Sequence, residues 1–160
     1  MTDSQVYYLD TSALVKRYAQ EDGSARVQAL CEDEGSSKVI GHIGLVETIA
    51  ALNKKQRQGT LGERNCAQLI KDFLNDTQDN DYIFVAIDDR VINQAADLAQ
   101  QYPLRGYDAV HLSCALTVKS SYLDAPDAEM TFVAADGDLL DAARAEGFDT
   151  ERPEDNARLN

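Results

Sequence analysis

The stretch VYYLDTSALVKRYAQ, residues 6–20, sets the architecture of this 160-residue chain. Its first four residues are apolar and predict a short buried strand. Asp10 follows at once, and a helical pattern begins at Thr11. A strand that passes through a single carboxylate into a helix is typical of a sheet covered by helices.

Strands and helices alternate along the rest of the chain. This order predicts an α/β fold in which helices flank a central, mostly parallel sheet. Ligands of such sheets bind at the carboxyl ends of the strands, so that edge is the expected place for a functional site. The predicted strands are 6–9, 38–42, 82–87 and 131–135, and the predicted helices are 11–20, 23–34, 43–56, 61–77, 89–101, 107–118 and 137–147, with a loop at 120–129.

The composition is that of an ordinary globular protein, with 44% hydrophobic and 27% charged residues. We expect one domain over residues 1–150 and a polar, mobile tail at 151–160. No apolar run reaches the roughly 20 residues that span a bilayer. The apolar run before Asp10 is also too short for a signal peptide, so the expected location is cytoplasmic.

Cysteine and histidine are too few and too scattered for a zinc site or a disulfide framework. The cysteines Cys31, Cys66 and Cys114 contain no CxxC pair. His42 and His111 are the only histidines, which excludes a multi-histidine metal site. Oxygen ligands remain as the means of binding a metal.

Three aspartates stand where a predicted element begins or ends. Asp10 and Asp136 directly follow predicted strands. Asp108 lies at the start of a predicted helix that is apolar on nearly all of its faces. Each of them, taken alone, is also explained as a helix cap or a first-turn residue. Their positions nevertheless predict that Asp10 and Asp136 share the carboxyl edge of the sheet.

Glu47 is harder to explain as a structural residue. Ile43, Val46 and Ala50 lie on the same helix face, which we therefore expect to point into the core. A carboxylate there is costly unless it meets a lysine, an arginine or a metal ion. Several half-buried carboxylates can share one site when Mg²⁺ or Mn²⁺ neutralises them, because these ions take oxygen ligands alone.

Four blocks of sequence, taken in order, resemble the PIN domain, and specifically the VapC-type toxin ribonucleases of bacterial toxin–antitoxin pairs. The resemblance extends through about residue 148 and implies the PIN-like three-layer fold. The blocks are YYLDTSALVKRY (7–18), GLVETIAAL (44–52), LRGYDAVHLSCAL (104–116) and FVAADGDLLDAARAEGF (132–148).

The resemblance also implies an activity and a site. It implies an endoribonuclease that needs Mg²⁺ or Mn²⁺, acts on RNA, forms a homodimer and pairs with an antitoxin protein in a type II system. Bound metal would position a water for in-line attack on a phosphodiester. The residues that match the family's four catalytic and metal-binding acids are Asp10, Glu47, Asp108 and Asp136.

Other residues match supporting positions of the family. Thr11 or Ser12 matches a hydroxyl beside the first acid that supports the site through hydrogen bonds. Asp138 is a candidate for indirect support of the site. His111 matches a position where histidine is frequent, and we interpret it as a packing or supporting residue rather than a catalytic one.

The net charge of −13 departs from what an RNA-binding protein needs, because phosphate contacts require lysine and arginine. RNA would have to enter along a local basic strip. The candidates are Lys16 with Arg17, or Lys54, Lys55 and Arg57, although a solvated helix face is the simpler explanation of the second group.

Other functions remain to be weighed against a nuclease. Haloacid dehalogenase-like phosphatases need a second aspartate two residues after the first, and Ser12 stands there. A response-regulator receiver would need paired acids and a late lysine, which are absent. A catalytically silent PIN-like interaction or regulatory module stays open, as does the role of residues 59–81 in dimerisation or antitoxin binding.

Overall fold

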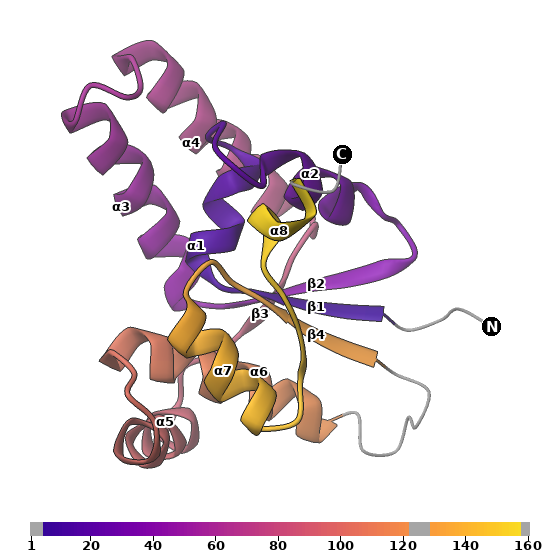
Figure 1. Cartoon of the computed structure of the whole chain (residues 1–160). Helices are drawn as coiled ribbons and strands as arrows, with labels where there is room; N and C mark the ends of the chain where they lie inside the picture. The colour runs from indigo at the N-terminus through magenta and orange to yellow at the C-terminus, as the bar shows by residue number, and fades with distance from the viewer. Residues whose placement is uncertain (1–4, 122–128, 158–160) are drawn as a thin grey trace.

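A computed structural model describes residues 5–121 and 129–157 of the chain, and Figure 1 shows its arrangement. Within these residues the strands are β1 (Gln5–Leu9), β2 (Ser36–Gly41), β3 (Ile83–Val85), β4 (Glu129–Val133) and β5 (Asp149–Glu151). All pair in parallel, in the order β3-β2-β1-β4-β5. The helices are α1 (Thr11–Leu14), the 3-10 turn η1 (Val15–Arg17), α2 (Ser24–Glu32), α3 (Ile43–Arg57), α4 (Glu63–Gln78), α5 (Asp89–Gln101), α6 (Gly106–Ser121), α7 (Gly137–Ala145) and α8 (Pro153–Ala157).

The sheet lies between two helical layers, which confirms the predicted three-layer α/β fold (Figure 1). Successive strand residues face opposite layers because the side-chain period of a strand is two. Leu9 and Val133 therefore pack in the cluster formed with α1 and α2, while Tyr8 and Phe132 pack in the cluster formed with α5, α6 and α7. The Tyr8 and Phe132 rings stack with centroids 5.2 Å apart.

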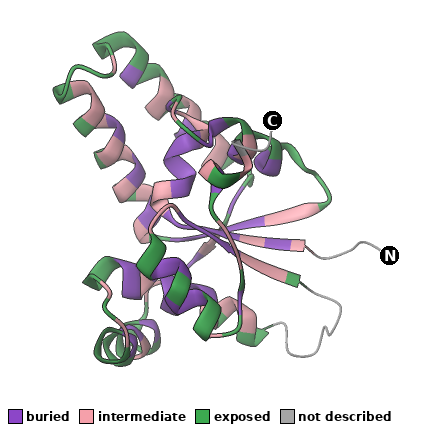
Figure 2. Ribbon diagram, in the orientation of Figure 1, coloured by how far each residue is buried: buried purple, intermediate pink, exposed green. Residues whose placement is uncertain are grey.

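Helices α3 and α4 form a hairpin that stands away from the sheet, at the upper left of Figure 1. Its inner side is buried, because Leu52 of α3 and Cys66 of α4 pack in one cluster with Val15 and Ala19. Its far end is exposed (Figure 2). Gly59 lies in the turn there with a φ of +79°, a left-handed backbone conformation that residues with a Cβ rarely adopt.

The carboxyl-terminal region differs from the sequence-based prediction. The predicted tail forms regular secondary structure as far as Ala157: Glu151 ends β5, which pairs with β4, and Pro153–Ala157 form the short helix α8. Ion pairs hold both, one from Arg26 Nε to Glu151 at 2.7 Å and one from Lys16 Nζ to Glu154 at 2.7 Å. The domain boundary at residue 150 stays a prediction.

Several other boundaries moved by a few residues. The helix predicted from Thr11 is divided into α1 and η1, and β4 ends at Val133 because the Ala135 N–H bonds to the Ser12 hydroxyl instead of a strand. Most of the predicted loop at 120–129 lies outside the described residues. Within the part of the chain that the structure covers, no helix is long and apolar enough to cross a membrane.

Candidate active site

The candidate site lies where the sheet topology reverses. The chain builds β2 and β3 on one side of β1 and then adds β4 on the other. The connections after β1 and β4 enter opposite helical layers, since α1 follows β1 and α7 follows β4. A crevice opens at such a switch point, at the carboxyl ends of the two strands. Asp10 and Asp136 stand at these two ends, as predicted.

Asp10 is fixed by the start of α1 and by its neighbour Ser12. It is 5% exposed, and its Oδ2 accepts hydrogen bonds from the backbone N–H of Ser12 at 3.2 Å and from the Ser12 hydroxyl at 2.6 Å. The same hydroxyl oxygen accepts from Ala135 N at 3.0 Å. Ser12 therefore joins the end of β1 to the segment that leads from β4 to Asp136.

Glu47 reaches the same region from α3. Its Oε1 accepts a hydrogen bond from Thr11 Oγ1 at 3.0 Å and lies 2.5 Å from His111 Nε2. Because a carboxylate only accepts, Nε2 carries a hydrogen in this contact. The other ring nitrogen of His111 lies 2.7 Å from the hydroxyl of Tyr8, which also accepts from Gly41 N. This buried chain of contacts orients Glu47.

The predicted orientation of α3 was wrong. The residues of α3 that are buried are Gly44, Thr48 and Leu52, whereas Val46, beside Glu47, is 67% exposed. The face that carries Glu47 thus borders a pocket and solvent, and its partners are His111 and Thr11 rather than a lysine or arginine. Ile43, Val46 and Ala50 made that face look apolar, but apolar side chains also occur where a helix borders a cleft.

Asp108 and Asp136 are linked by one cation. Arg105 Nε lies 3.2 Å from Asp108 Oδ2, and Arg105 Nη2 lies 3.2 Å from Asp136 Oδ2. Asp108 is 4% exposed in the first turn of α6, while Asp136 accepts from Leu139 N as the N-cap of α7. Both therefore have the helix-terminal positions that also explain an aspartate on its own.

All four predicted acids line one pocket of about 660 Å³, which we call the acid pocket. Its donor groups suit a hard divalent cation, because they are carboxylate and hydroxyl oxygens. In the described part of the chain, however, no three acidic, histidine or cysteine side chains are arranged so that they could hold a metal ion as they stand. The lining residues are Asp10, Thr11, Ser12, Glu47, Ala50, Ala51, Lys54, Arg57, Arg105, Tyr107, Asp108 and Asp136.

The electrostatics of the acid pocket reflect crowded negative charge. Burial and the neighbouring Asp10 raise the pKa of Asp108, and Arg105 offsets only part of this effect. Burial lowers the pKa of His111, but its contact with Glu47 and the charge of Asp10 outweigh burial and raise that pKa overall. Both shifts have the sign expected when a site holds more carboxylates than cations.

The structure separates the two basic strips predicted from the sequence. Lys16 is buried and pairs with Glu21 and Glu154, and Arg17 pairs with Asp81. Neither is free to bind RNA. Lys55 also pairs with Glu21, whereas Lys54 and Arg57 line the acid pocket.

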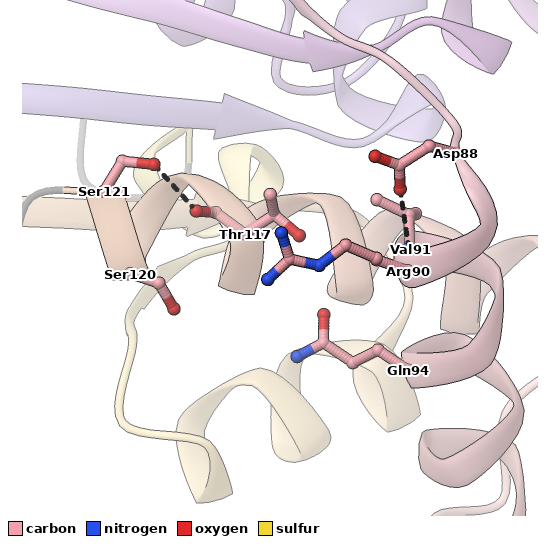
Figure 3. Close-up of a pocket in the computed structure, with 7 residues that line it drawn as sticks. All are labelled: Asp88, Arg90, Val91, Gln94, Thr117, Ser120 and Ser121. Carbon is pink, nitrogen blue, oxygen red and sulfur yellow. Dashed lines mark hydrogen bonds between the residues drawn. The ribbon is translucent and has the colours of Figure 1, made fainter.

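A second hollow, of about 360 Å³, lies between α5 and α6 and is shown in Figure 3. Its acidic and hydroxyl groups are already used: Asp88 caps α5 through Val91 N, and the hydroxyls of Thr117, Ser120 and Ser121 donate to carbonyls four residues earlier. This hollow therefore has none of the carboxylate crowding of the acid pocket.

Three contributors to the site were not recognised in the sequence: Tyr8, Arg105 and Tyr107. Arg105 stands three residues before Asp108, a spacing that places two residues on one helix face and could have indicated the pair. No local signal links Arg105 to Asp136 or Tyr8 to His111, because these contacts join distant segments. Asp138, a candidate supporting residue, is exposed and does not line the acid pocket.

The PIN domain family model matches residues 7–144 of the chain. No curated protein sequence matches it. The fold is similar to that of PAE2754 from Pyrobaculum aerophilum, with a TM-score of 0.62 and 20% identity over 96% of this chain and 86% of the other.

Two further structures share the fold. VapBC2 from Rickettsia felis, solved bound to a DNA fragment from its promoter, matches with a TM-score of 0.60 and 14% identity, over 92% of this chain and 98% of the other. The sarcin-ricin loop cleaving toxin VapC20 of Mycobacterium tuberculosis matches with a TM-score of 0.60 and 16% identity, over 89% of this chain and 95% of the other. At these identities the likeness is one of fold.

Proposed function

We propose that this chain, which belongs to the PIN domain family, is an endoribonuclease that hydrolyses RNA phosphodiester bonds and depends on Mg²⁺ or Mn²⁺. We further propose that it is the toxin of a type II toxin–antitoxin pair, active as a homodimer and inhibited by an antitoxin protein. The structurally similar VapBC2 and VapC20 proteins support the second proposal.

The observation that carries the proposal is the gathering of Asp10, Glu47, Asp108 and Asp136 around the acid pocket. Each comes from a different segment of the chain. A cap or a first-turn residue explains each aspartate separately, but it does not explain why all of them face one cavity together with Glu47. Like charges in a shared, half-buried site are stabilised when a cation binds between them.

In this proposal the protein's own residues orient the carboxylates. Ser12 holds Asp10, and His111 holds Glu47 through a contact that is itself backed by Tyr8. His111 is therefore a positioning residue. A bound Mg²⁺ or Mn²⁺ would supply activation of a water molecule and stabilisation of the leaving oxygen.

Cleavage of a single-stranded RNA in Mg²⁺ tests the proposal. Asp136→Asn should lower the rate by on the order of 10²-fold or more, because asparagine can still cap α7 but carries no charge. Asp138→Asn is the matched control, since Asp138 lies two residues further on and outside the acid pocket. EDTA should abolish the activity of the wild type.

One observation favours the catalytically silent alternative. Arg105 already neutralises part of the charge on Asp108 and Asp136, as a structural ion pair would. The same experiment decides between the two. If Mg²⁺ and Mn²⁺ do not bind, or if cleavage is unchanged by EDTA and by Asp136→Asn, the nuclease proposal is wrong.

A further inference from the structure

The acid pocket is not acidic throughout. Along the wall formed by α3, Glu47 is followed by Ala50, Lys54 and Arg57. At 1.5 Å per residue, Lys54 and Arg57 lie roughly 10 and 15 Å further along the helix axis than Glu47. The wall thus changes from negative near the sheet to positive toward the tip of the α3–α4 hairpin.

Lys54 and Arg57 differ from the other cations of this region in being unused. Both are exposed, and within the described residues no ion pair involves either side chain. Lys55, next to them, is already paired with Glu21. In a chain of net charge −13, two free cations on one face of a helix beside four carboxylates are positioned to attract a polyanion.

The start of α6 adds an aromatic surface to the lining of the acid pocket. Tyr107 lines the acid pocket and is 42% exposed, and the Arg105 guanidinium lies 4.8 Å from its ring centroid. Proteins that bind single strands combine a positive track along the backbone with aromatic rings on which bases stack. A duplex offers no such free base, because its bases are already stacked on one another.

We propose that the acid pocket accepts single-stranded RNA with its phosphates on Lys54 and Arg57 and a base on Tyr107. This inference rests on the proposed function and adds the path of the bound RNA. The RNA runs from the four carboxylates outward along α3. Lys16, Arg17 and Lys55 take no part, since each is paired within the protein.

Binding of a fluorescently labelled single-stranded oligouridylate, followed by anisotropy in EDTA at low salt, tests the proposal without cleavage. The double variant Lys54→Gln/Arg57→Gln should bind roughly tenfold more weakly. Its slope of log K against log salt should also be shallower by about 1.4, which corresponds to two lost phosphate contacts on a single strand. The matched control is Arg64→Gln/Lys71→Gln, which removes two exposed cations of α4 that lie outside the acid pocket.

Tyr107 is tested by its different signature. Tyr107→Ala should weaken binding by roughly fivefold or more and leave the salt slope unchanged, because stacking displaces no counterions. Tyr107→Phe should restore binding. The same oligonucleotide hybridised to oligoadenylate should bind more weakly than the single strand.

Three results would overturn the proposal: no binding by the wild type, an equal loss in the two double variants, or equal binding of the duplex. A second measurement, of cleavage in Mg²⁺, keeps this test separate from that of the proposed function. If the variants bind in the expected pattern but the wild type does not cleave RNA, the nuclease proposal is rejected, and the proposal that Lys54, Arg57 and Tyr107 bind RNA is supported. If the wild type cleaves RNA but Lys54→Gln/Arg57→Gln binds the oligonucleotide normally, only the proposed role of Lys54 and Arg57 is rejected.

Discussion

Two clusters of acidic side chains in this molecule differ in how their charge is balanced. In the first, which we call the balanced cluster, Lys16 lies 3.1 Å from Glu21 and 2.7 Å from Glu154, and Lys55 lies 2.7 Å from Glu21. Each carboxylate there has a lysine of its own. This cluster joins η1, α3 and α8, and it has the character of a structural contact.

The acid pocket has the opposite character. Four carboxylates line it, and Arg105, itself 63% exposed, is the cation that contacts two of them. Glu47 depends on hydrogen bonds from Thr11 and His111 instead. A cluster that supplies its own counter-ions stabilises the fold, whereas one left with surplus charge is suited to binding a cation from solution.

The largest expected effect contrasts one lysine from each region. Lys16→Ala should lower the free energy of unfolding by about 3 kcal/mol, because it removes a buried cation that contacts both glutamates and leaves half-buried Glu154 with only its longer contact to Arg152. Lys54→Ala should change it by less than about 0.5 kcal/mol. Urea denaturation measures both, and equal effects would show that the two regions do not differ in this way.

Mg²⁺ should stabilise the acid pocket but not the balanced cluster. At about 100 times its Kd, a bound ion adds about 2.7 kcal/mol to the free energy of unfolding. Asp108→Asn should lose most of this gain and, in EDTA, should be at least as stable as the wild type because it removes a crowded charge. Asp138→Asn should respond to Mg²⁺ as the wild type does, and melting curves with and without Mg²⁺ compare the three proteins. An absence of any shift in the wild type would contradict the metal site.

Arg105 should compete with the metal for Asp108 and Asp136. Arg105→Gln should therefore lower the Kd for Mg²⁺ by roughly two- to fivefold, as expected for the loss of an exposed ion pair. Calorimetric titration measures this, with Arg144→Gln as a control because Arg144 forms an exposed pair with Asp141 outside the pocket. Weaker binding in Arg105→Gln would mean that Arg105 orients the carboxylates for the ion.

The smallest expected effect is a pH response of opposite sign in the two regions. Burial and Asp10 raise the pKa of Asp108, so the folded state holds its proton more tightly than the unfolded state. As the pH falls through that raised pKa, the wild type should gain stability relative to Asp108→Asn in EDTA.

Glu21 should respond in the other direction. Burial would raise the pKa of Glu21, but hydrogen bonds from Lys55 and Lys16 outweigh it and lower that pKa. Its contribution is present above the unfolded pKa and is lost as the pH falls through the folded one, so the wild type should lose stability relative to Glu21→Gln. Denaturation across the acid range would refute the contrast if both differences had the same sign.

Most of the fold was predictable because its signals are local. The β1–Asp10–α1 unit, the apolar helix α6 and the Gly59 turn each follow from a few neighbouring residues. Elements whose stability comes from distant partners were missed. Strand β5 has the polar sequence DTE and exists because β4 pairs with it, and Glu154 fixes α8 through Lys16.

The acid pocket divides in the same way. Asp10 and Asp136 were placed correctly, because a residue that follows a parallel strand within a few positions lies near the carboxyl edge of the sheet; Asp10 follows β1 directly and Asp136 comes three residues after the end of β4. The face of α3 was misread, since alanine and valine beside Glu47 are compatible with either a core or a cleft. A hydrophobic pattern reports which residues tolerate burial, and the packing of other elements selects the face that is buried.

Chain order and residue type alone therefore specified an α/β protein with acids at one edge of its sheet. They could not specify the charge balance at that edge. Lys16 and Lys54 are both lysines within predicted helices, yet one is buried between two glutamates and the other borders the acid pocket. The reason is physical: strand ends and helix starts depend on residues a few positions apart, whereas an ion pair forms only when the folded backbone brings charges from distant segments within a few ångströms.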